Sequence, residues 1–173
     1  RLACQIRPQD SVNVIALVPH DAKPAAAHAK PGYQQGREMK IAVLFADLRG
    51  STKLCEERLP FDVVFVLNQF FSELSKALAE TNGHYAQFAG DGLMAIYGLD
   101  SDPKTGAAEA IAGAVTMLRR LESLNERLKQ ELKDGLKIGV GIHTGAAIVG
   151  SMGPPAAPII SALGYNVNVA ARL

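Results

Sequence analysis

The sequence predicts an α+β fold, a ferredoxin-like split βαββαβ core with an antiparallel-rich sheet and helices on one face. Three observations lead to it. A continuous apolar run at 39–47 ends in a carboxylate, two long amphipathic segments cover 60–80 and 104–133, and short strands flank tight glycine turns. The 173 residues, 48% hydrophobic and 20% charged, suit one globular domain.

The first half begins with the run MKIAVLFAD at 39–47, which is typical of a buried strand. A turn at 48–50 leads to Ser51 and Thr52, either of which could cap a helix. Pro60 separates a short first turn from a helix predicted over 60–80, which Asn82 and Gly83 end. Its apolar stripe comprises Val64, Leu67, Phe71, Leu74 and Leu78.

Two short strands follow, at 84–89 and 93–97, around the turn Gly90-Asp91-Gly92. A second helix is predicted over 104–133, and two further strands at 137–143 and 146–151 around Thr144 and Gly145. After a proline-rich loop at 154–158, the final VNVAARL begins a helix, so the order is β-α-β-β-α-β-β-α. The inward stripe of the second helix comprises Ala110, Ala114, Met117, Leu121, Leu124 and Leu128.

The N-terminal part differs in composition from the rest. Residues 1–18 indicate a turn followed by a strand from Ser11 to Val18. Residues 19–38 contain three prolines and many alanines without sustained periodicity, which is typical of a linker. The chain starts at Arg1 and stops at Leu173, and we expect it to be truncated at both ends of a larger protein.

Charge and cysteine content exclude several classes of protein. Eighteen Lys and Arg balance seventeen Asp and Glu, which argues against a nucleic-acid-binding surface. No apolar run is long enough to span a bilayer. Two cysteines are too few for a disulfide-stapled secreted scaffold. We therefore expect a cytoplasmic location, with anchoring by a region outside the chain left open.

Two aspartates lie at positions that predict a metal site. Asp47 ends the first strand, which carries no charge after Lys40, and Asp91 lies between two glycines at a hairpin tip. In a split βαβ sheet these two places are neighbours. Converging carboxylates suit Mg²⁺ or Mn²⁺ bound together with phosphates. The alternative is that Asp47 merely starts a turn and Asp91 is an ordinary Asp-Gly hairpin residue.

The turn after the first strand adds a candidate phosphate site. Gly50, Ser51 and Thr52 offer backbone N–H groups at the start of a helix, which can hold an anion. A third constellation is Asn168 with Arg172, four residues apart and so on one face of the last predicted helix. An amide and a guanidinium suit a sugar oxygen and a phosphoryl oxygen. Alone, such a pair is more often a solvated helix face.

Four motifs in sequence carry a family resemblance. FADLRGST, FAGDGLMAIYG, VGIHTGAAIVG and LGYNVNVAARL, in this order and spacing, resemble the catalytic domain of class III nucleotidyl cyclases. The resemblance covers residues 39–173. It implies the same βαββαβ core, a head-to-tail homodimer, and conversion of ATP to 3′,5′-cyclic AMP and pyrophosphate by attack of the ribose 3′-oxygen on the α-phosphate.

The resemblance also implies residue roles. Asp47 and Asp91, with the backbone carbonyl of Leu48, would hold two Mg²⁺ or Mn²⁺ ions. Asn168 would orient the ribose, and Arg172 would stabilise the charge that develops on the α-phosphate. Metals would come from one subunit and the purine and transition-state residues from the other.

Several positions depart from the family pattern. Gln87 stands where adenylate cyclases place a lysine that reads adenine, and Ser161 replaces the usual Asp or Thr of the purine site. Gly139 replaces an expected arginine, and Lys137 is the nearest cation on the same strand face. ATP is favoured over GTP. We expect His143 to be a core histidine with its hydrogen bonds satisfied, not a catalyst.

Other functions remain open alternatives. A guanylate or dual-specificity cyclase would fit the ambiguous purine residues. A weakly active, cyclase-like nucleotide-binding regulatory module would fit the departures, and a polymerase-palm-like phosphoryl transferase shares paired carboxylates on a similar sheet.

A smaller resemblance concerns residues 1–18. RLACQIRP followed by SVNVIALV resembles the C-terminal end of a plant-type [2Fe–2S] ferredoxin domain, whose last cluster ligand would be Cys4. Three further cysteine ligands are absent, and Cys55 belongs to the cyclase part, so this chain alone cannot hold the cluster. The alternative is that Cys4 is an ordinary buried cysteine. An upstream Fe–S domain would regulate the cyclase through the linker 19–38.

Overall fold

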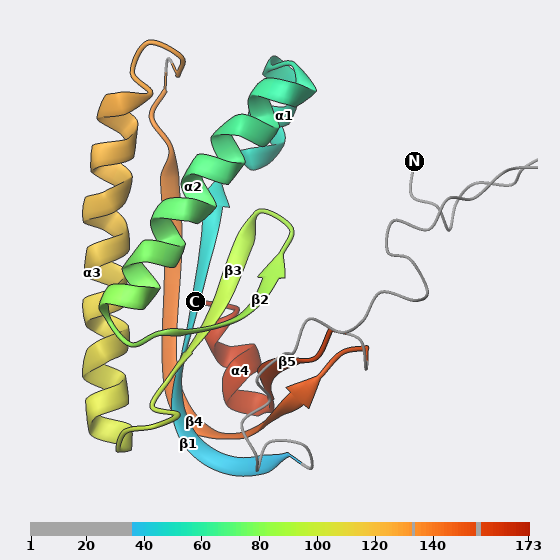
Figure 1. The fold of residues 1–173 in the computed structure, drawn as a ribbon, viewed down its shortest axis with the longest axis vertical. Helices are drawn as coiled ribbons and strands as arrows, with labels where there is room; N and C mark the ends of the chain where they lie inside the picture. Colours follow the sequence, from blue (N-terminus) through green and yellow to red (C-terminus); the bar gives the residue numbers. More distant parts are fainter. Residues whose placement is uncertain (1–35, 133, 155–156) are drawn as a thin grey trace, which may run out of the picture.

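The architecture is a five-stranded sheet covered by helices, in the strand order β2-β3-β1-β4-β5 (Figure 1). The computed structural model describes residues 36–132, 134–154 and 157–173. All neighbouring strands are antiparallel. The α+β prediction is confirmed. The predicted strand Ser11 to Val18, the ferredoxin-like segment with Cys4, and linker residues 19–35 lie outside the described residues.

Strand β1 (Arg37–Arg49) is the centre of the sheet, between β3 and β4. Its apolar residues alternate between two cores, because successive side chains of a strand point to opposite faces. Ala42, Leu44 and Ala46 belong to one core and Ile41 and Val43 to the other. The strand begins two residues inside the segment predicted as linker and includes the first two residues of the turn predicted at 48–50.

Helices α1 (Ser51–Glu57) and α2 (Pro60–Glu80) follow. The break before Pro60 and both ends of α2 agree with the prediction. The predicted helix cap is wrong, because the N-cap of α1 is Gly50 in the left-handed conformation (φ 75°) and no side chain caps the helix. Glycine adopts this conformation without steric cost.

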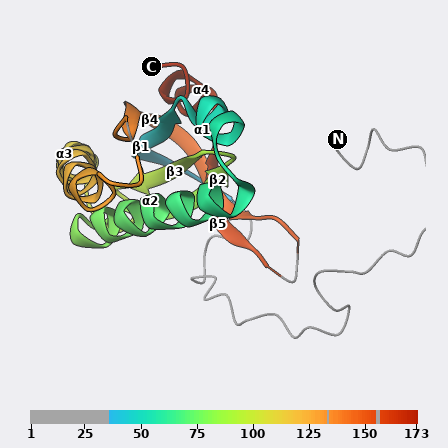
Figure 2. The same cartoon turned by 90° about the horizontal axis from the view of Figure 1, so that it is seen from above.

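Helix α3 (Pro103–Arg127) lies beside α2 on one face of the sheet (Figure 2). Asp102 caps it by accepting hydrogen bonds from the N–H groups of Lys104 and Thr105. The helix ends six residues before the predicted boundary, and the chain continues in turns. The leucines predicted to lie inward remain buried there, including Leu128 just beyond the helix.

The apolar stripe predicted for α2 was partly wrong. Leu74 and Leu78 are buried, but Val64 is 56% exposed and its neighbour Val63 is buried instead. The helix is rotated relative to the prediction, because it packs against α3 as well as the sheet. The buried residues of α2 are Val63, Val66, Phe70, Glu73, Leu74, Ala77 and Leu78.

The hairpin of β2 (His84–Ala89) and β3 (Gly92–Tyr97) agrees closely with the prediction. Every residue of β3 is buried, because this strand lies inside the sheet between β2 and β1. The hairpin tip at Gly90 and Asp91 projects toward the end of β1, as Asp47 pairs with Gly92. The tip therefore delivers Asp91 to the first strand's last residues.

The second half of the sheet differs from the prediction. One strand, β4 (Lys137–Met152), replaces the two predicted strands, because Thr144 and Gly145 stay paired with Ala42 and Ile41 of β1. β1 and β4 curve together at one end of the sheet (Figure 1). The far part of β4 pairs with β5 (Ile159–Leu163), a strand the sequence analysis missed.

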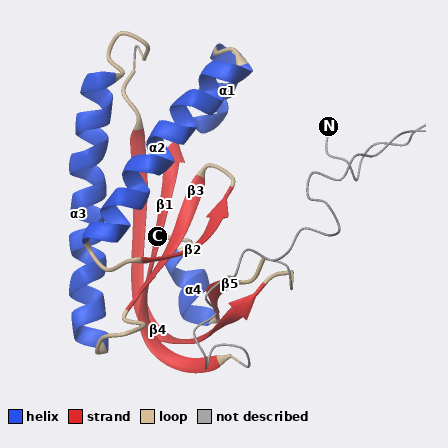
Figure 3. Ribbon diagram, in the orientation of Figure 1, coloured by secondary structure: helices blue, strands red, loops and turns tan. Residues whose placement is uncertain are grey.

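Helix α4 (Tyr165–Ala170) packs against the other face of the sheet from α2 and α3 (Figures 2 and 3). Its buried residues Val167 and Ala170 join the second core with Ile41 and Val43. The prediction of helices on one face thus holds for α2 and α3 only. None of the helices in the described segments is long and apolar enough to cross a membrane.

Candidate active site

The carboxylates of Asp47 and Asp91 meet at the end of β1. Asp47 is opposite Gly92 in the β1·β3 ladder, one residue from Asp91. The N–H of Leu48 donates a hydrogen bond to the backbone carbonyl of Asp91 at 3.2 Å, which ties the hairpin tip to the strand. The structure therefore brings together the two predicted metal ligands, Asp47 and Asp91. Leu48, whose backbone carbonyl was predicted to assist them, lies beside both.

Gly92 allows this close approach. A Cβ at position 92 would lie 2.8 Å from the carbonyl oxygen of Ala46 and 3.0 Å from Oδ1 of Asp47. Real Cβ atoms do not approach other atoms so closely, and only glycine fits here. Gly92 at the hairpin tip thus does more than form the turn, because it also lets the hairpin approach β1 closely.

Electrostatics at the pair favours a bound cation. Partial burial raises the pKa of Asp47, the neighbouring Asp91 carboxyl raises it further by charge and hydrogen bonding, and the positive charge of Arg49 opposes both. Two facing carboxylates repel each other when both are ionised. A divalent cation between them removes that repulsion, so the donor set fits Mg²⁺ or Mn²⁺.

The protein alone offers few ligands. No group of three or more His, Cys, Asp or Glu residues that could hold a metal occurs in the described segments. Two carboxylates and a main-chain oxygen leave coordination positions for water and substrate phosphates, as is usual where Mg²⁺ is bound together with a nucleotide.

Ser51 supports the pair instead of capping α1. Its hydroxyl donates a hydrogen bond to a carboxylate oxygen of Asp91. Gly50, in the left-handed conformation, turns the chain so that Ser51 comes back over the hairpin tip. Thr52 is exposed on the first turn of α1. The predicted phosphate cradle at 50–52 therefore adjoins the carboxylates, and its binding role stays a prediction.

Asn168 and Arg172 lie on the α4 face. The sequence predicted both on one helix, but α4 ends at Ala170, and Arg172 follows in a turn closed by its N–H donating to the carbonyl of Val169 at 3.0 Å. Both side chains are exposed in the single chain. They are thus accessible to a second molecule, and their catalytic roles stay predictions.

A hydrogen-bonded bridge that the sequence analysis missed holds α4 on the sheet. The side-chain oxygen of Asn166 is 3.0 Å from Nε2 of His143, and its amide nitrogen donates to the carbonyl of Ala146 at 2.8 Å. Gly145 leaves room for this amide, since a Cβ there would lie 2.7 Å from Oδ1 of Asn166. His143 is half-buried, not fully in the core, and its Nε2 has a hydrogen-bond partner, while its non-catalytic role stays a prediction.

Of the two predicted purine-reading residues, one lies away from the carboxylates within one chain. Ser161 is 4% exposed in β5 and pairs with Gly150, eleven residues along β4 from Gly139, which pairs with Asp47. Gln87 is exposed on β2, opposite Met94. Within one chain Ser161 is therefore away from the carboxylates, whereas Gln87 is on the hairpin that carries Asp91.

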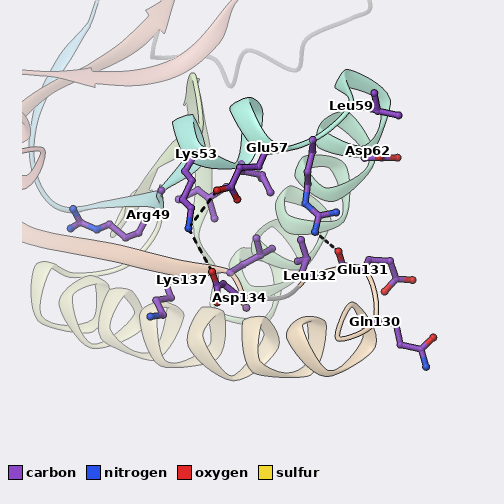
Figure 4. Close-up of a pocket in the computed structure, with 16 residues that line it drawn as sticks. Arg49, Lys53, Glu57, Leu59, Asp62, Gln130, Glu131, Leu132, Asp134 and Lys137 are labelled. Atoms are coloured by element: carbon purple, nitrogen blue, oxygen red, sulfur yellow. Dashed lines mark hydrogen bonds and ion pairs between the residues drawn. The ribbon is translucent and has the colours of Figure 1, made fainter.

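A cleft of about 1230 Å³ borders Leu48 and Arg49 at the end of β1 (Figure 4). It lies between α1, the start of α2 and residues 130–132 and 134–137, and neither Asp47 nor Asp91 lines it. Within it, Lys53 contacts both Glu57 and Asp134 at 3.7 Å. The cleft adjoins the candidate site, because Leu48, Arg49 and Gly50 line it, but it does not include the two carboxylates.

Comparison with known proteins decides the family. The model of the adenylate and guanylate cyclase catalytic domain matches residues 33–173. This chain belongs to that family. Among solved structures, the cyclase domain is similar to the adenylyl cyclase CyaB from P. aeruginosa, at 30% identity with a TM-score of 0.74, covering 79% of this chain and 71% of that one. It is also similar to the guanylyl cyclase Cya2, at 31% identity and a TM-score of 0.73, covering 79% and 70%.

Curated relatives are longer proteins. The cyclase domain is 32% identical over 134 residues to adenylate cyclase 1 of Rhizobium meliloti (strain 1021), covering 78% of this chain and 20% of that protein. It is 32% identical over 138 residues to an adenylate cyclase of Anabaena cylindrica, covering 78% and 26%. The chain thus spans about a quarter or less of these two relatives.

Proposed function

We propose that this domain is an adenylate cyclase that converts ATP to 3′,5′-cyclic AMP and pyrophosphate with two Mg²⁺ or Mn²⁺ ions. The observation that carries the proposal is the meeting of Asp47 and Asp91 over Gly92, with Ser51 donating to Asp91. Both aspartates are held by described elements, Asp47 by β1 and Asp91 by the β2–β3 hairpin.

The residues divide the work. Asp47, Asp91 and the carbonyl of Leu48 would hold the cations, which when bound lower the pKa of the ribose 3′-hydroxyl and neutralise the leaving phosphates. The turn at 50–52 would place the phosphate chain against the carboxylates. Asn168 would orient the ribose so that its 3′-oxygen faces the α-phosphorus, and Arg172 would stabilise the charge on the α-phosphate.

The positions of these residues support a homodimer. The side chains of Asn168 and Arg172 are exposed, and Ser161 is well removed along β4 from the partner of Asp47. A head-to-tail pair of chains would bring the α4 and β5 residues of one copy to the carboxylates of the other. Each site would then draw its metal ligands and its purine and ribose contacts from different subunits.

ATP is the proposed substrate because two curated relatives at 32% identity are adenylate cyclases. Gln87 can donate to or accept from either purine, and Cya2, a guanylyl cyclase, is 31% identical. A guanylate or dual-specificity cyclase is therefore the second candidate. Control by an upstream [2Fe–2S] domain through Cys4, and a low-turnover regulatory module, remain hypotheses from the sequence.

Product identification tests the proposal. The intact protein is incubated with ATP or GTP and Mn²⁺, and the products are separated by chromatography and identified by mass spectrometry. We expect cyclic AMP and pyrophosphate in excess over cyclic GMP, and no product from Asp47→Ala or Asp91→Ala. Tight nucleotide binding without cyclic product would support the regulatory module instead. Normal turnover without either carboxylate would refute the metal assignment.

A further inference from the structure

Arg49 lies on the sheet face of the carboxylate pair. Alternate residues of a strand point to the same side, so Arg49 and Asp47 share a face of β1. In the β1·β4 ladder Asp47 pairs with Gly139 and Arg49 pairs with Lys137. Gly139 is thus diagonal to Arg49, within reach of a long side chain on the same face.

The side chain of Arg49 extends across to Gly139. A Cβ built on Gly139 would lie 2.5 Å from the guanidinium carbon Cζ of Arg49, and closer still to Nε and Nη2. The guanidinium can lie there only because residue 139 has no side chain. A positive charge is therefore held over β4 at the residue directly opposite Asp47.

This guanidinium differs from the neighbouring ammonium group of Lys53. Lys53 contacts Glu57 and Asp134, whereas Arg49 has no salt bridge or hydrogen-bond partner among the residues that the structure describes. Figure 4 shows Arg49 pointing away from Lys53 and its two acidic partners. Its charge acts on Asp47, but an exposed guanidinium without a hydrogen-bond or salt-bridge partner in the described segments offers a planar fork of donors that matches phosphate oxygens.

We propose that Arg49, from its place over Gly139, binds the β- and γ-phosphates of the nucleoside triphosphate. This inference rests on the proposed function, because it assigns a residue to the phosphate end of the same substrate. The two carboxylates repel phosphate and can hold it only through cations, whereas a guanidinium bonds phosphate oxygens directly. Residue 139 carries no cation of its own, and Arg49 fills the space into which a side chain at 139 would extend.

The competing explanation is that Arg49 only balances the charge of Asp47. The two explanations predict different measurements. A charge-balancing arginine opposes cation binding, so its removal would strengthen Mn²⁺ binding without nucleotide and leave the preference for triphosphate unchanged. A phosphate-binding arginine contributes to triphosphate affinity, and hardly to the affinity for a nucleoside monophosphate.

The test uses calorimetry on the intact protein with Mn²⁺ and α,β-methylene-ATP, which cannot be cyclised by loss of pyrophosphate, and with AMP. We compare wild type, Arg49→Ala, Gly139→Ala and the double variant, with Lys53→Ala as the matched cation control. We expect Arg49→Ala to weaken α,β-methylene-ATP binding by about tenfold or more and AMP binding by less than about twofold. Lys53→Ala should change neither affinity.

Gly139→Ala keeps the arginine but displaces its guanidinium, so it too should weaken triphosphate binding. In the Arg49→Ala background the same alanine should have no further effect, because the displaced group is already gone. Equal losses for both ligands, no loss, or additive effects in the double variant would overturn the role of Arg49. Wild-type protein that binds the triphosphate but yields no cyclic product would contradict the proposed function alone.

Discussion

Gly92 faces Asp47, its partner in the β1·β3 ladder, so closely that a Cβ built on Gly92 would lie 3.0 Å from Oδ1 of Asp47. The β2–β3 hairpin must approach β1 closely for Asp91 to reach Asp47, and a side chain at position 92 would prevent it. The geometry of the proposed metal site therefore depends on the absence of one methyl group.

Gly92→Ala tests this dependence. The added Cβ would lie 2.8 Å from the carbonyl oxygen of Ala46 and 3.0 Å from Oδ1 of Asp47, so the hairpin tip must move. We expect Mn²⁺ affinity, measured by calorimetry, and cyclase activity to fall by about tenfold or more, because metal sites depend on their supporting geometry. Circular dichroism checks that the variant is folded. A folded variant with wild-type Mn²⁺ affinity would contradict the argument.

Ser51→Ala removes the hydroxyl that donates to Asp91. Without that hydrogen bond the carboxylate loses its fixed orientation, and we expect Mn²⁺ affinity and activity to fall by about tenfold. Because only one side-chain atom is lost, the melting temperature should change little. Ser75→Ala, on the exposed face of α2, is the control, and an identical response of both variants would argue against a supporting role for Ser51.

Asn166 is predicted to hold α4 in place through His143 and the carbonyl of Ala146. Asn166→Ala should lower the free energy of unfolding by about 1–2 kcal/mol, because two hydrogen bonds of a partly buried amide are lost. It should also lower kcat, since Asn168 and Arg172 are carried by the same segment. Asn68→Ala, exposed on α2, is the control.

A double-mutant cycle isolates the contact between the two side chains. His143→Ala and Asn166→Ala together should destabilise the protein by about 1 kcal/mol less than the sum of the single variants, as for residues in direct contact. Strict additivity in chemical denaturation would show that the bond to Ala146 alone anchors the helix.

Local sequence patterns correctly predicted the helices and strands whose ends are marked by proline or glycine residues. Pro60 starts α2 and the Asn82-Gly83 pair follows its end, and glycines mark the hairpin that holds Asp91. Thr144 and Gly145 resemble a turn, yet they remain in β4 because both pair with β1. Pairing with a distant strand overrode the local preference.

Part of the candidate site could likewise be predicted from the sequence and part could not. The meeting of Asp47 and Asp91 follows from the topology alone, since a strand end and a hairpin tip adjoin. The placement of Arg49 over Gly139 and the bridge between Asn166 and His143 depend on which residues face each other across strands and on the docking of α4. No periodicity in the sequence gives that register.

The buried Glu73 of α2 leads to a prediction about acid stability. Its carboxylate contacts Lys76, Arg120 and Arg127 at 2.9 Å each, joining α2 to α3. Burial raises the pKa of Glu73, but the hydrogen bonds and charges of these partners outweigh it and hold the pKa below its ordinary value of 4.5. The charged form therefore stabilises the folded state above that value, and this stabilisation is lost as the pH falls through the lowered pKa.

Glu73→Gln removes the charge while nearly preserving the shape. At pH 7 we expect the free energy of unfolding to fall by about 2 kcal/mol, because three charge-assisted contacts are weakened. Below about pH 4.5 the difference between variant and wild type should shrink, since protonation removes the same charge from the wild type. Urea denaturation across this pH range measures both effects. Glu126→Gln, which removes a fully solvated ion pair with Lys129, is the matched control and should change stability by less than about 0.5 kcal/mol. A constant difference at all pH values would mean that Glu73 acts through packing instead of charge.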